Sequence, residues 1–183
     1  MRLVITNGTL LTLGRPCRVL EGQQLLIEGD RITRIAPQGG PVTDQPVDRV
    51  LDAAGQVVLP GFVNAHMHFY STLVRGLGKA APSKATVLIL GESGVAHLWW
   101  RLDRQLGLDG VEVCAEVALL DAIRQGTTTV IDHHASPGAV SGSLDRIAAA
   151  VTRTGLRAAL CYEVSDRDGD EVRDAGLAEN AAF

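Results

Sequence analysis

The stretch "VVLPGFVNAHMHF", residues 57–69, decides the fold class, because it is nearly continuously apolar and yet contains two histidines one residue apart. A run of this kind is typical of a strand covered on both faces, as in the parallel sheet of an α/β protein. Successive strand residues point to opposite faces, so His66 and His68 share one face and Met67 points away from it. The stretch therefore predicts a buried strand that ends on a pair of imidazoles.

A helical pattern follows at residues 111–125, and Gly126 stands where a helix stop belongs. The next residues, "TTTVIDHH" at 127–134, are typical of a β-branched strand. The apolar side chains of the helical pattern are Val113, Val117 and Leu120, with Cys114 and Ala118 beside them.

A second amphipathic helix ends at Gly155, and the apolar run "LRAALCYEV" at 156–164 predicts a third strand. Strands that alternate with helices in this way indicate parallel βαβ units. His66 and His68 would then lie at the carboxyl end of the first strand, where the active sites of parallel α/β folds form. The helix is marked by Leu144, Ile147, Ala148 and Val151.

Residues 1–56 read as a small all-β unit of short strands and turns. Asn7-Gly8 predicts a turn, and Gly29-Asp30 predicts the two-residue connection of a tight hairpin. The segment from Tyr70 to about Leu108 is too long for an ordinary connection, and we expect a long loop with some helix there.

The composition indicates a soluble globular protein and excludes several other classes. The formal net charge of the 183 residues is −4, so no basic surface points to nucleic acid or to an anionic membrane. No apolar run approaches the roughly 18 residues that a membrane span needs. The three cysteines are unpaired in spacing, and no signal peptide is recognisable, so we expect a cytoplasmic protein with reduced thiols.

Spacing and placement alone leave two interpretations of His66 and His68 open. In the first, both imidazoles bind one metal ion at about 2.0–2.1 Å. In the second, each is an ordinary strand residue whose ring is satisfied by its neighbours. Burying two imidazoles without polar partners costs free energy, so a metal ion that both bind is a reasonable hypothesis.

The longer stretch "VLDAAGQVVLPGFVNAHMHFYSTLVRG", residues 50–76, resembles the signature of the amidohydrolase superfamily, and its P-G-x-x-N-x-H-x-H element is highly specific. "NGTLLTL" and "LLIEGDRITRIAP" resemble the β-sandwich start of members with a composite second domain. Residues 98–137 resemble the aminohydrolase and chlorohydrolase branch. The resemblance covers essentially the whole chain.

This resemblance implies the start of a (β/α)8 barrel in residues 57–183, preceded by part of a β-sandwich in residues 1–56. It implies that His66 and His68 are the first-strand ligands of one divalent metal ion, Zn²⁺ or Fe²⁺. The ion would activate water for attack on a non-peptide C–N bond of a small heterocyclic or amidine substrate. The full-length protein could be a homodimer.

Other residues are weaker candidates. Trp100 and Asp103 match a region that caps the substrate in related deaminases, although Trp99 and Trp100 could equally pack the loop or a subunit contact. His133 and His134 are adjacent in a strand and face opposite ways, so at most one could line the pocket; the resemblance makes neither a metal ligand. Surface or structural roles are expected for the remaining polar candidates, which are Arg75, His97, Asp132, Glu163 and Asp166.

A complete barrel has eight strands in about 250 residues, and three strands are recognisable before Phe183. By resemblance, two further histidines, an aspartate and the general acid/base belong to later strands. We therefore expect an N-terminal fragment that is inactive, marginally stable and weak in metal binding by itself. The alternative is a non-catalytic binding module that retains the start of the barrel.

Overall fold

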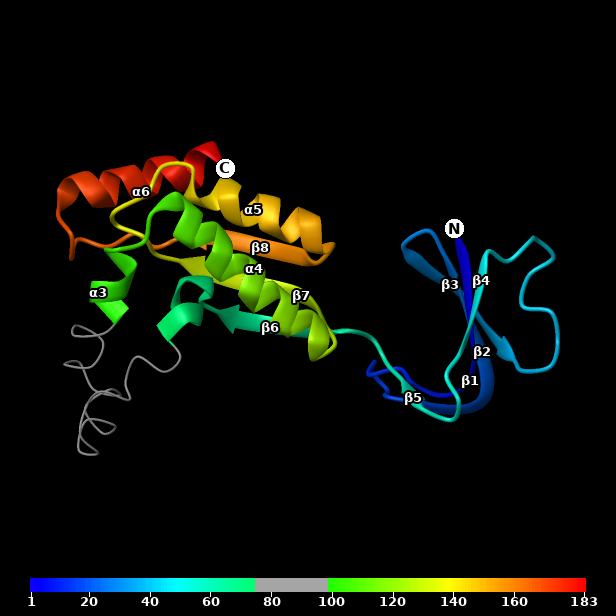
Figure 1. The fold of residues 1–183 in the computed structure, drawn as a ribbon. Coiled ribbons are helices and arrows are strands. Elements are labelled where there is room, and N and C mark those ends of the chain that lie inside the picture. Colours follow the sequence, from blue (N-terminus) through cyan, green and yellow to red (C-terminus); the bar gives the residue numbers. More distant parts are fainter. Residues whose placement is uncertain (75–98) are drawn as a thin grey trace, which may run out of the picture. The chain divides into compact units, whose positions relative to one another are not determined.

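The computed structural model describes residues 1–74 and 99–183, and the chain divides into two compact units, Met1–Pro60 and Gly61–Phe183 (Figure 1). Two residues considered above, Arg75 and His97, lie outside the described residues. No helix in the described ranges is long and apolar enough to cross a membrane.

The first unit is a five-stranded sheet built around β1 (Arg2–Leu11). β2 (Val19–Glu28) pairs antiparallel with β1, and β3 (Arg31–Pro37) pairs antiparallel with β2 through the predicted hairpin. β4 (Arg49–Asp52) and β5 (Val57–Val58) pair parallel with β1. The sheet buries a small core of Val4, Leu26, Ala36 and Val42. A second sheet that would complete a sandwich stays a prediction.

The turn predicted at Asn7-Gly8 is wrong, because β1 runs through these residues as one strand with a bulge. Its register with β2 shifts between Ile5 and Gly8. Asn7 takes a left-handed conformation (φ 56°), which asparagine tolerates better than most residues. A Cβ on Gly8 would lie 2.7 Å from Val58 Cγ2, so close packing against β5 requires the glycine.

The apolar stretch of residues 57–69, predicted as one strand, divides into two. Val57 and Val58 form β5 in the first unit, and β6 (Phe62–Met67) belongs to the second. Pro60 lies between them and has no amide hydrogen to donate to a sheet, which favours the break.

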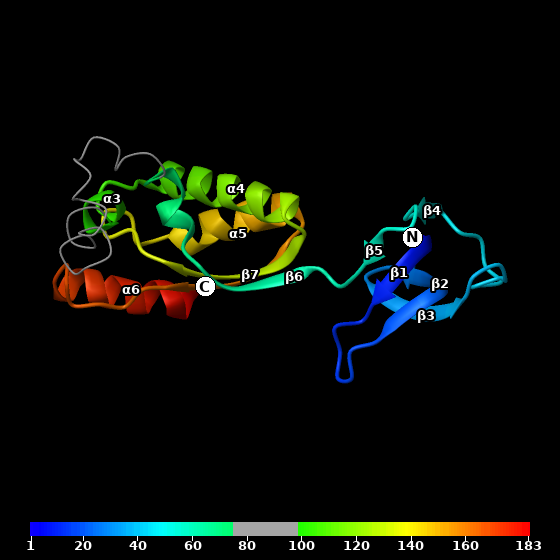
Figure 2. The same ribbon diagram turned by 90° about the horizontal axis from the view of Figure 1, so that it is seen from below.

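The second unit is a parallel sheet of three strands in the order β6-β7-β8, as the βαβ pattern predicted. β7 (Thr127–His134) and β8 (Arg157–Tyr162) alternate with α4 (Leu108–Arg124) and α5 (Ser143–Thr154), and α6 (Asp170–Ala182) follows β8 (Figure 1). The carboxyl ends of the strands lie at the same end of the unit, beside two short helices (Figure 2). These are the 3₁₀ helix η1 (Phe69–Val74) and α3 (Trp100–Asp103).

One face of this sheet is covered and the other is open. Val130, Asp132 and His134 of β7 are fully buried, whereas Ile131 between them is 41% exposed. The covered face joins a core that includes Phe69 of η1 and side chains of α4 and α5. The core of this unit therefore lies between the sheet and its helices.

Helix α4 begins earlier than the predicted range of residues 111–125 and buries only part of the predicted apolar face. Cys114 and Ala118 are buried, but Val113, Val117 and Leu120 are 46%, 43% and 56% exposed. The face of α4 that packs inward combines small side chains, which let the helix approach its neighbours closely, with Val111 and Leu119.

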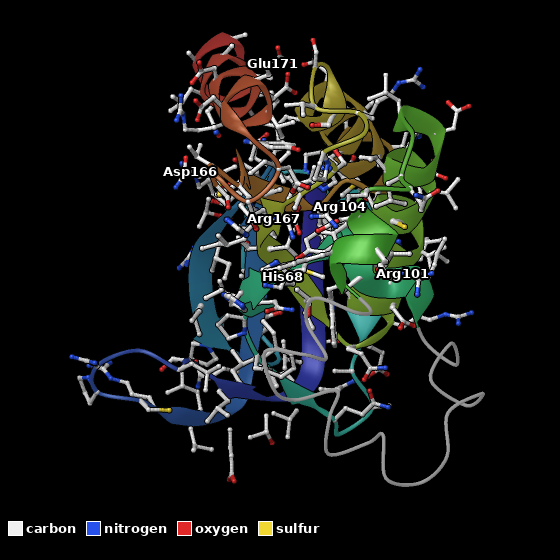
Figure 3. The ribbon with its side chains drawn as sticks, turned by 90° about the vertical axis from the view of Figure 1, so that its left-hand side faces the viewer. His68, Arg101, Arg104, Asp166, Arg167 and Glu171 are labelled. Atoms are coloured by element: carbon white, nitrogen blue, oxygen red, sulfur yellow. The ribbon has the colours of Figure 1, made fainter. Side chains whose placement is uncertain are left out.

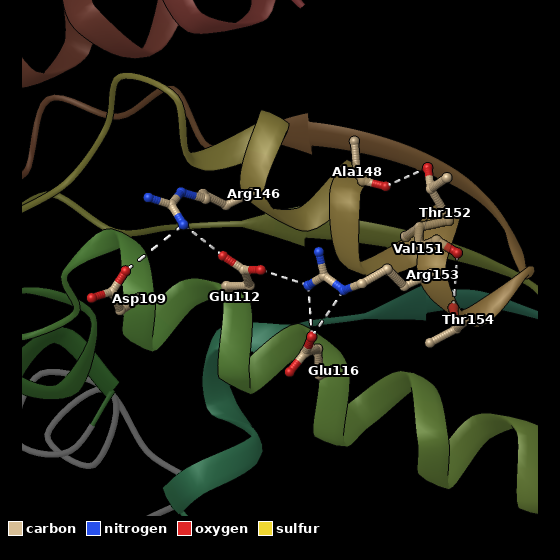
Figure 4. Close-up of polar contacts among 9 residues, drawn as sticks. All are labelled: Asp109, Glu112, Glu116, Arg146, Ala148, Val151, Thr152, Arg153 and Thr154. Atoms are coloured by element: carbon tan, nitrogen blue, oxygen red, sulfur yellow. Dashed lines mark hydrogen bonds and ion pairs between the residues drawn. The ribbon is translucent and has the colours of Figure 1, made fainter.

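Ion pairs on the outer surface join α4 to α5 (Figure 4). The Arg153 guanidinium lies 2.5 Å from Glu112 and 2.6 Å from Glu116, and Arg146 lies 2.7 Å from Glu112. These residues are solvent-exposed or partly so, and exposed pairs stabilise a fold only weakly. Their main effect is to fix which faces of the two helices meet.

A buried carboxylate joins α6 to the start of α5. Glu179 is 8% exposed, and its two oxygens accept hydrogen bonds from the amides of Gly142 (2.8 Å) and Leu144 (2.9 Å). These amides belong to the first turn of α5, which has no side-chain cap of its own. Glu179 therefore acts as the N-cap of a helix distant in sequence.

Replacing Glu179 with alanine removes this cap and leaves the two amides without acceptors. We expect E179A to lower the free energy of unfolding by about 1–2 kcal/mol, measured by urea denaturation. D174A, on the exposed side of the same helix, is the control and should change stability little. Equal effects of the two substitutions would contradict the capping role.

Candidate metal centre

His66 lies in β6 and His68 directly follows the strand, and their rings lie together at its carboxyl end. Their Nε2 atoms are 3.1 Å apart, and the ring planes are nearly perpendicular. Simple alternation does not produce this, because β6 carries an extra residue between Asn64 and Met67 relative to β7. Bulges of this kind often redirect side chains beside functional sites.

A hydrogen bond from β7 sets the proton position on the His68 ring. Its Nδ1 lies 2.8 Å from the backbone oxygen of His133. A carbonyl oxygen can only accept, so Nδ1 carries the hydrogen and Nε2 of the neutral ring keeps its lone pair. Nε2 of His66 then donates the hydrogen that the two rings share. His68 is thereby prepared to act as a ligand through Nε2.

The donor set fits a divalent metal ion. Two nitrogens that each lie about 2.0–2.1 Å from one Zn²⁺ can be at most about 4.2 Å apart, and the observed 3.1 Å is within that limit. Imidazole suits both Zn²⁺ and Fe²⁺. Among the residues that the structure describes, no third His, Cys, Asp or Glu side chain completes the site. The described chain therefore offers two ligands of a larger set.

His133 and His134 lie on opposite faces of β7. The His133 ring is half-buried and 5.6 Å from the His68 ring. Burial lowers the pKa of His133, while Glu163 raises it and the two β6 histidines lower it further. His133 is thus the histidine on the side of the candidate ligands.

His134 lies in the core between Tyr70 and Tyr162 and is 0% exposed. Its Nε2 is 2.9 Å from Ser136 Oγ, and burial lowers its pKa to about 3, so the ring is neutral. The structure therefore places this candidate substrate contact away from the β6 histidines, because its position in β7 points it to the covered face.

The side chain of Asp132 is also on the covered face and is 0% exposed. Its Oδ1 accepts a 2.7 Å hydrogen bond from the amide of Phe69, and its Oδ2 accepts none within the described residues. Burial raises the pKa of Asp132 to about 7, although the Phe69 amide works to lower it. Asp132 thus holds the residue that directly follows His68.

Asp103 forms a buried ion pair with Arg167. It is 1% exposed and lies 2.6 Å from the Arg167 guanidinium, which also stands 5.3 Å over the Trp100 ring. Burial raises the pKa of Asp103, and Arg167 opposes this. Both candidates of α3 therefore contact Arg167, at the end of the unit that Figure 3 faces.

Two charged residues of the loop after β8, Arg167 and Asp168, are largely buried, although the polar composition of this loop is typical of a solvated segment. Their side chains are only 12% and 11% exposed, and they lie 3.0 Å apart. Asp168 also pairs with Arg104 at 2.6 Å, and Glu163 lies 3.4 Å from Arg167. Asp103 and Arg104, which pair with Arg167 and Asp168, are each 64 residues away in sequence, a separation that no local pattern indicates.

A cavity of about 370 Å³ opens beside β6, on the side of α4. It contacts His68 but not His66, and most of its lining comes from η1, α4 and the start of β7. It is therefore not the space that both Nε2 atoms face.

Comparisons with known proteins show the family of the chain. Residues 57–182 match the amidohydrolase family. The 5'-deoxyadenosine deaminase of Methanobrevibacter smithii is 34% identical over 159 residues, which cover 87% of this chain and 32% of that protein. The 5-methylthioadenosine/S-adenosylhomocysteine deaminase of Moorella thermoacetica is 33% identical over 160 residues, covering 87% and 33%.

Solved structures give the same result. The zinc complex of atrazine chlorohydrolase TrzN from Arthrobacter aurescens superposes with a TM-score of 0.66 at 28% identity, over 87% of this chain and 35% of that one. A zinc-bound adenosine deaminase from Xanthomonas campestris superposes with a TM-score of 0.74 at 23% identity, over 96% and 37%, and supports the fold alone. The chain spans about a third of the length of the curated relatives described here.

Replacing Arg167 tests whether Asp103 depends on its ion pair. R167A leaves a buried carboxylate without its cation, and we expect the free energy of unfolding to fall by about 3–5 kcal/mol. R173A removes an arginine with three exposed acidic neighbours and should have little effect in the same urea titration. Similar small losses in both variants would show that Asp103 is indifferent to Arg167.

Asp132 should give the metal-free protein a distinctive pH dependence. Its pKa in the fold is about 7, above the ordinary 3.8, so the folded state keeps a proton that the unfolded chain loses. The stability contributed by the neutral carboxyl is complete below pH ~4 and is lost as the pH rises toward 7.

D132N cannot ionise and should lack this loss. Between pH 5 and 7 the two proteins should differ in slope by up to about 1.4 kcal/mol per pH unit, in urea unfolding with a chelator present. Parallel curves would mean that Asp132 is ionised in the fold.

Proposed function

The chain belongs to the amidohydrolase family, and we propose that His66 and His68 are metal ligands of a hydrolase that acts on a C–N bond of a small heterocyclic or amidine substrate. The observation that carries this proposal is the pair of Nε2 atoms 3.1 Å apart, with the Nδ1 of His68 held by the His133 carbonyl. In the structure the two Nε2 atoms share a hydrogen bond, and a metal ion bound by both would replace it.

A bound Zn²⁺ or Fe²⁺ would supply Lewis acidity and activate water at neutral pH. The protein's part is to present the two imidazoles: His68 is oriented through its Nδ1, and the backbone amide of His66 contacts Asn64 Oδ1 at 3.3 Å. Catalytic zinc sites use three protein ligands, so this function requires ligands outside the described residues.

The proposed substrate class rests on the relatives. Those named above are deaminases of adenosine derivatives and a triazine chlorohydrolase, and their substrates share a nitrogen heterocycle with a leaving group on an sp² carbon. His133 is our candidate for a substrate contact, because it is half-buried beside His68. Trp100 and Asp103 would shape this end of the unit through Arg167.

The metal assignment is tested on the full-length protein by measuring bound zinc after purification and dialysis. We expect H66A and H68A each to lose the metal, because each removes a ligand. H133A is the matched control: it deletes the neighbouring ring but keeps the backbone oxygen that orients His68, so it should retain zinc. Equal zinc content in all four proteins would refute a metal role for His66 and His68.

The reaction is tested with the same preparation on 5'-deoxyadenosine, 5'-methylthioadenosine and a chloro-s-triazine. Water replaces the leaving group at the ring carbon, so deamination releases ammonia and dechlorination releases chloride. We expect the wild type to turn over at least one of these substrates. H133A should lose a larger fraction of its activity than of its zinc content. A protein that binds zinc and the nucleosides but releases neither product would instead be a binding module.

A further inference from the structure

Two consecutive residues of β7, Asp132 and His133, accept hydrogen bonds from Phe69 and His68, which directly follow β6. The backbone oxygen of His133 accepts from the His68 ring at 2.8 Å, and the Asp132 carboxylate accepts from the Phe69 amide at 2.7 Å. The first contact fixes the ring and the second fixes the chain that carries it. We propose that Asp132 is a positioning residue for His68, an inference that rests on the proposed metal function.

The other restraints on His68 give the Asp132 contact its importance. The Ser71 hydroxyl and amide both donate to the His68 carbonyl, at 2.8 and 3.2 Å, and the Phe69 side chain is 0% exposed in the core. The His68 carbonyl and the Phe69 amide are therefore both hydrogen-bonded. Removing the Asp132 acceptor would release the amide at the start of η1, directly after the ligand.

His66 provides an internal contrast. It is exposed, its ring contacts that of His68, and its backbone amide donates a 3.3 Å hydrogen bond to Asn64 Oδ1. The His68 ring is thus half-buried and held by a backbone oxygen, whereas the His66 side chain is exposed. We therefore expect the precision of the site to depend on the groups that fix His68.

Packing alone does not explain a carboxylate at position 132. The side chain lies on the fully buried face of β7, between Val130 and His134. Its Oδ2 accepts no hydrogen bond within the described residues, which makes the group costly to bury. A β-branched apolar residue would suit the strand better, so the carboxylate is there for the one contact that it makes.

The test compares zinc affinity, by competition with a chromophoric chelator, in full-length wild type, D132V, D132A and D132N. D132V keeps the core filled but cannot accept from the Phe69 amide, and it serves where D132A folds poorly. D132N retains an acceptor oxygen. V130A is the matched control, since Val130 is equally buried on the same face of the same strand but holds neither His68 nor Phe69.

We expect D132V and D132A to weaken zinc binding about 10–100-fold, the usual effect of losing a group that orients a ligand. The zinc affinity of D132N should stay within about threefold of the wild-type value, and that of V130A should be unchanged. Both expectations hold even if the substitutions lower the melting temperature. Zinc affinities of D132V and D132A within twofold of wild type, or an equal loss in V130A, would overturn the positioning role. Full zinc affinity in H68A would instead show that the metal proposal itself fails.

Discussion

The hydrogen bond from His68 Nδ1 to the His133 carbonyl is the contact on which the rest of the candidate site depends. It joins the chain that follows β6 to β7, and it leaves the lone pair of His68 on Nε2, where it accepts from His66 in the structure and could bind a metal ion. Because the acceptor is a backbone oxygen, the pairing of β6 with β7 itself determines the tautomer. The fold and the chemistry of the site are therefore coupled through one atom.

The residues before and after His68 support this hydrogen bond. The bulge in β6 turns the ring of His66 toward that of His68, and the buried Phe69 anchors the chain that follows. Further along the same end of the unit, Arg167 gathers Asp103 and Trp100 into one cluster. Within the described residues, helices cover one face of the sheet, so the two candidate ligands lie at the boundary between a dense core and a more exposed surface.

The sequence predicts this architecture well where periodicity is strong. The alternation of strands and helices after residue 61 and the hairpin at Gly29-Asp30 both follow from local pattern, whereas the approach of the His66 and His68 rings involves a bulge that alternation does not predict. The break at Pro60 is also a local signal, but the apolar run around it concealed the change of sheet. The buried face of α4 was predicted incorrectly because the helix carries apolar side chains on two faces. Tertiary packing decides which face is buried.

The parts that could not be predicted depend on residues far apart in the chain. Nothing near Asp103 indicates that Arg167 neutralises it, and nothing near Asp132 indicates that it accepts from Phe69. His134 illustrates the same limit, since the doublet could be resolved only by knowing which face of β7 is covered. Recognition of a family supplies the ligands of a site, whereas their orientation comes from contacts that only the fold reveals.

The central claim is that β7 fixes His68 as a ligand before any metal binds. The most direct measurement is a long-range ¹H–¹⁵N NMR spectrum of the imidazoles in the metal-free full-length protein, assigned with H68A. This account predicts a neutral His68 ring protonated at Nδ1, with Nε2 bearing the lone pair. A His68 ring protonated at Nε2, or one exchanging freely between the two tautomers, would contradict it.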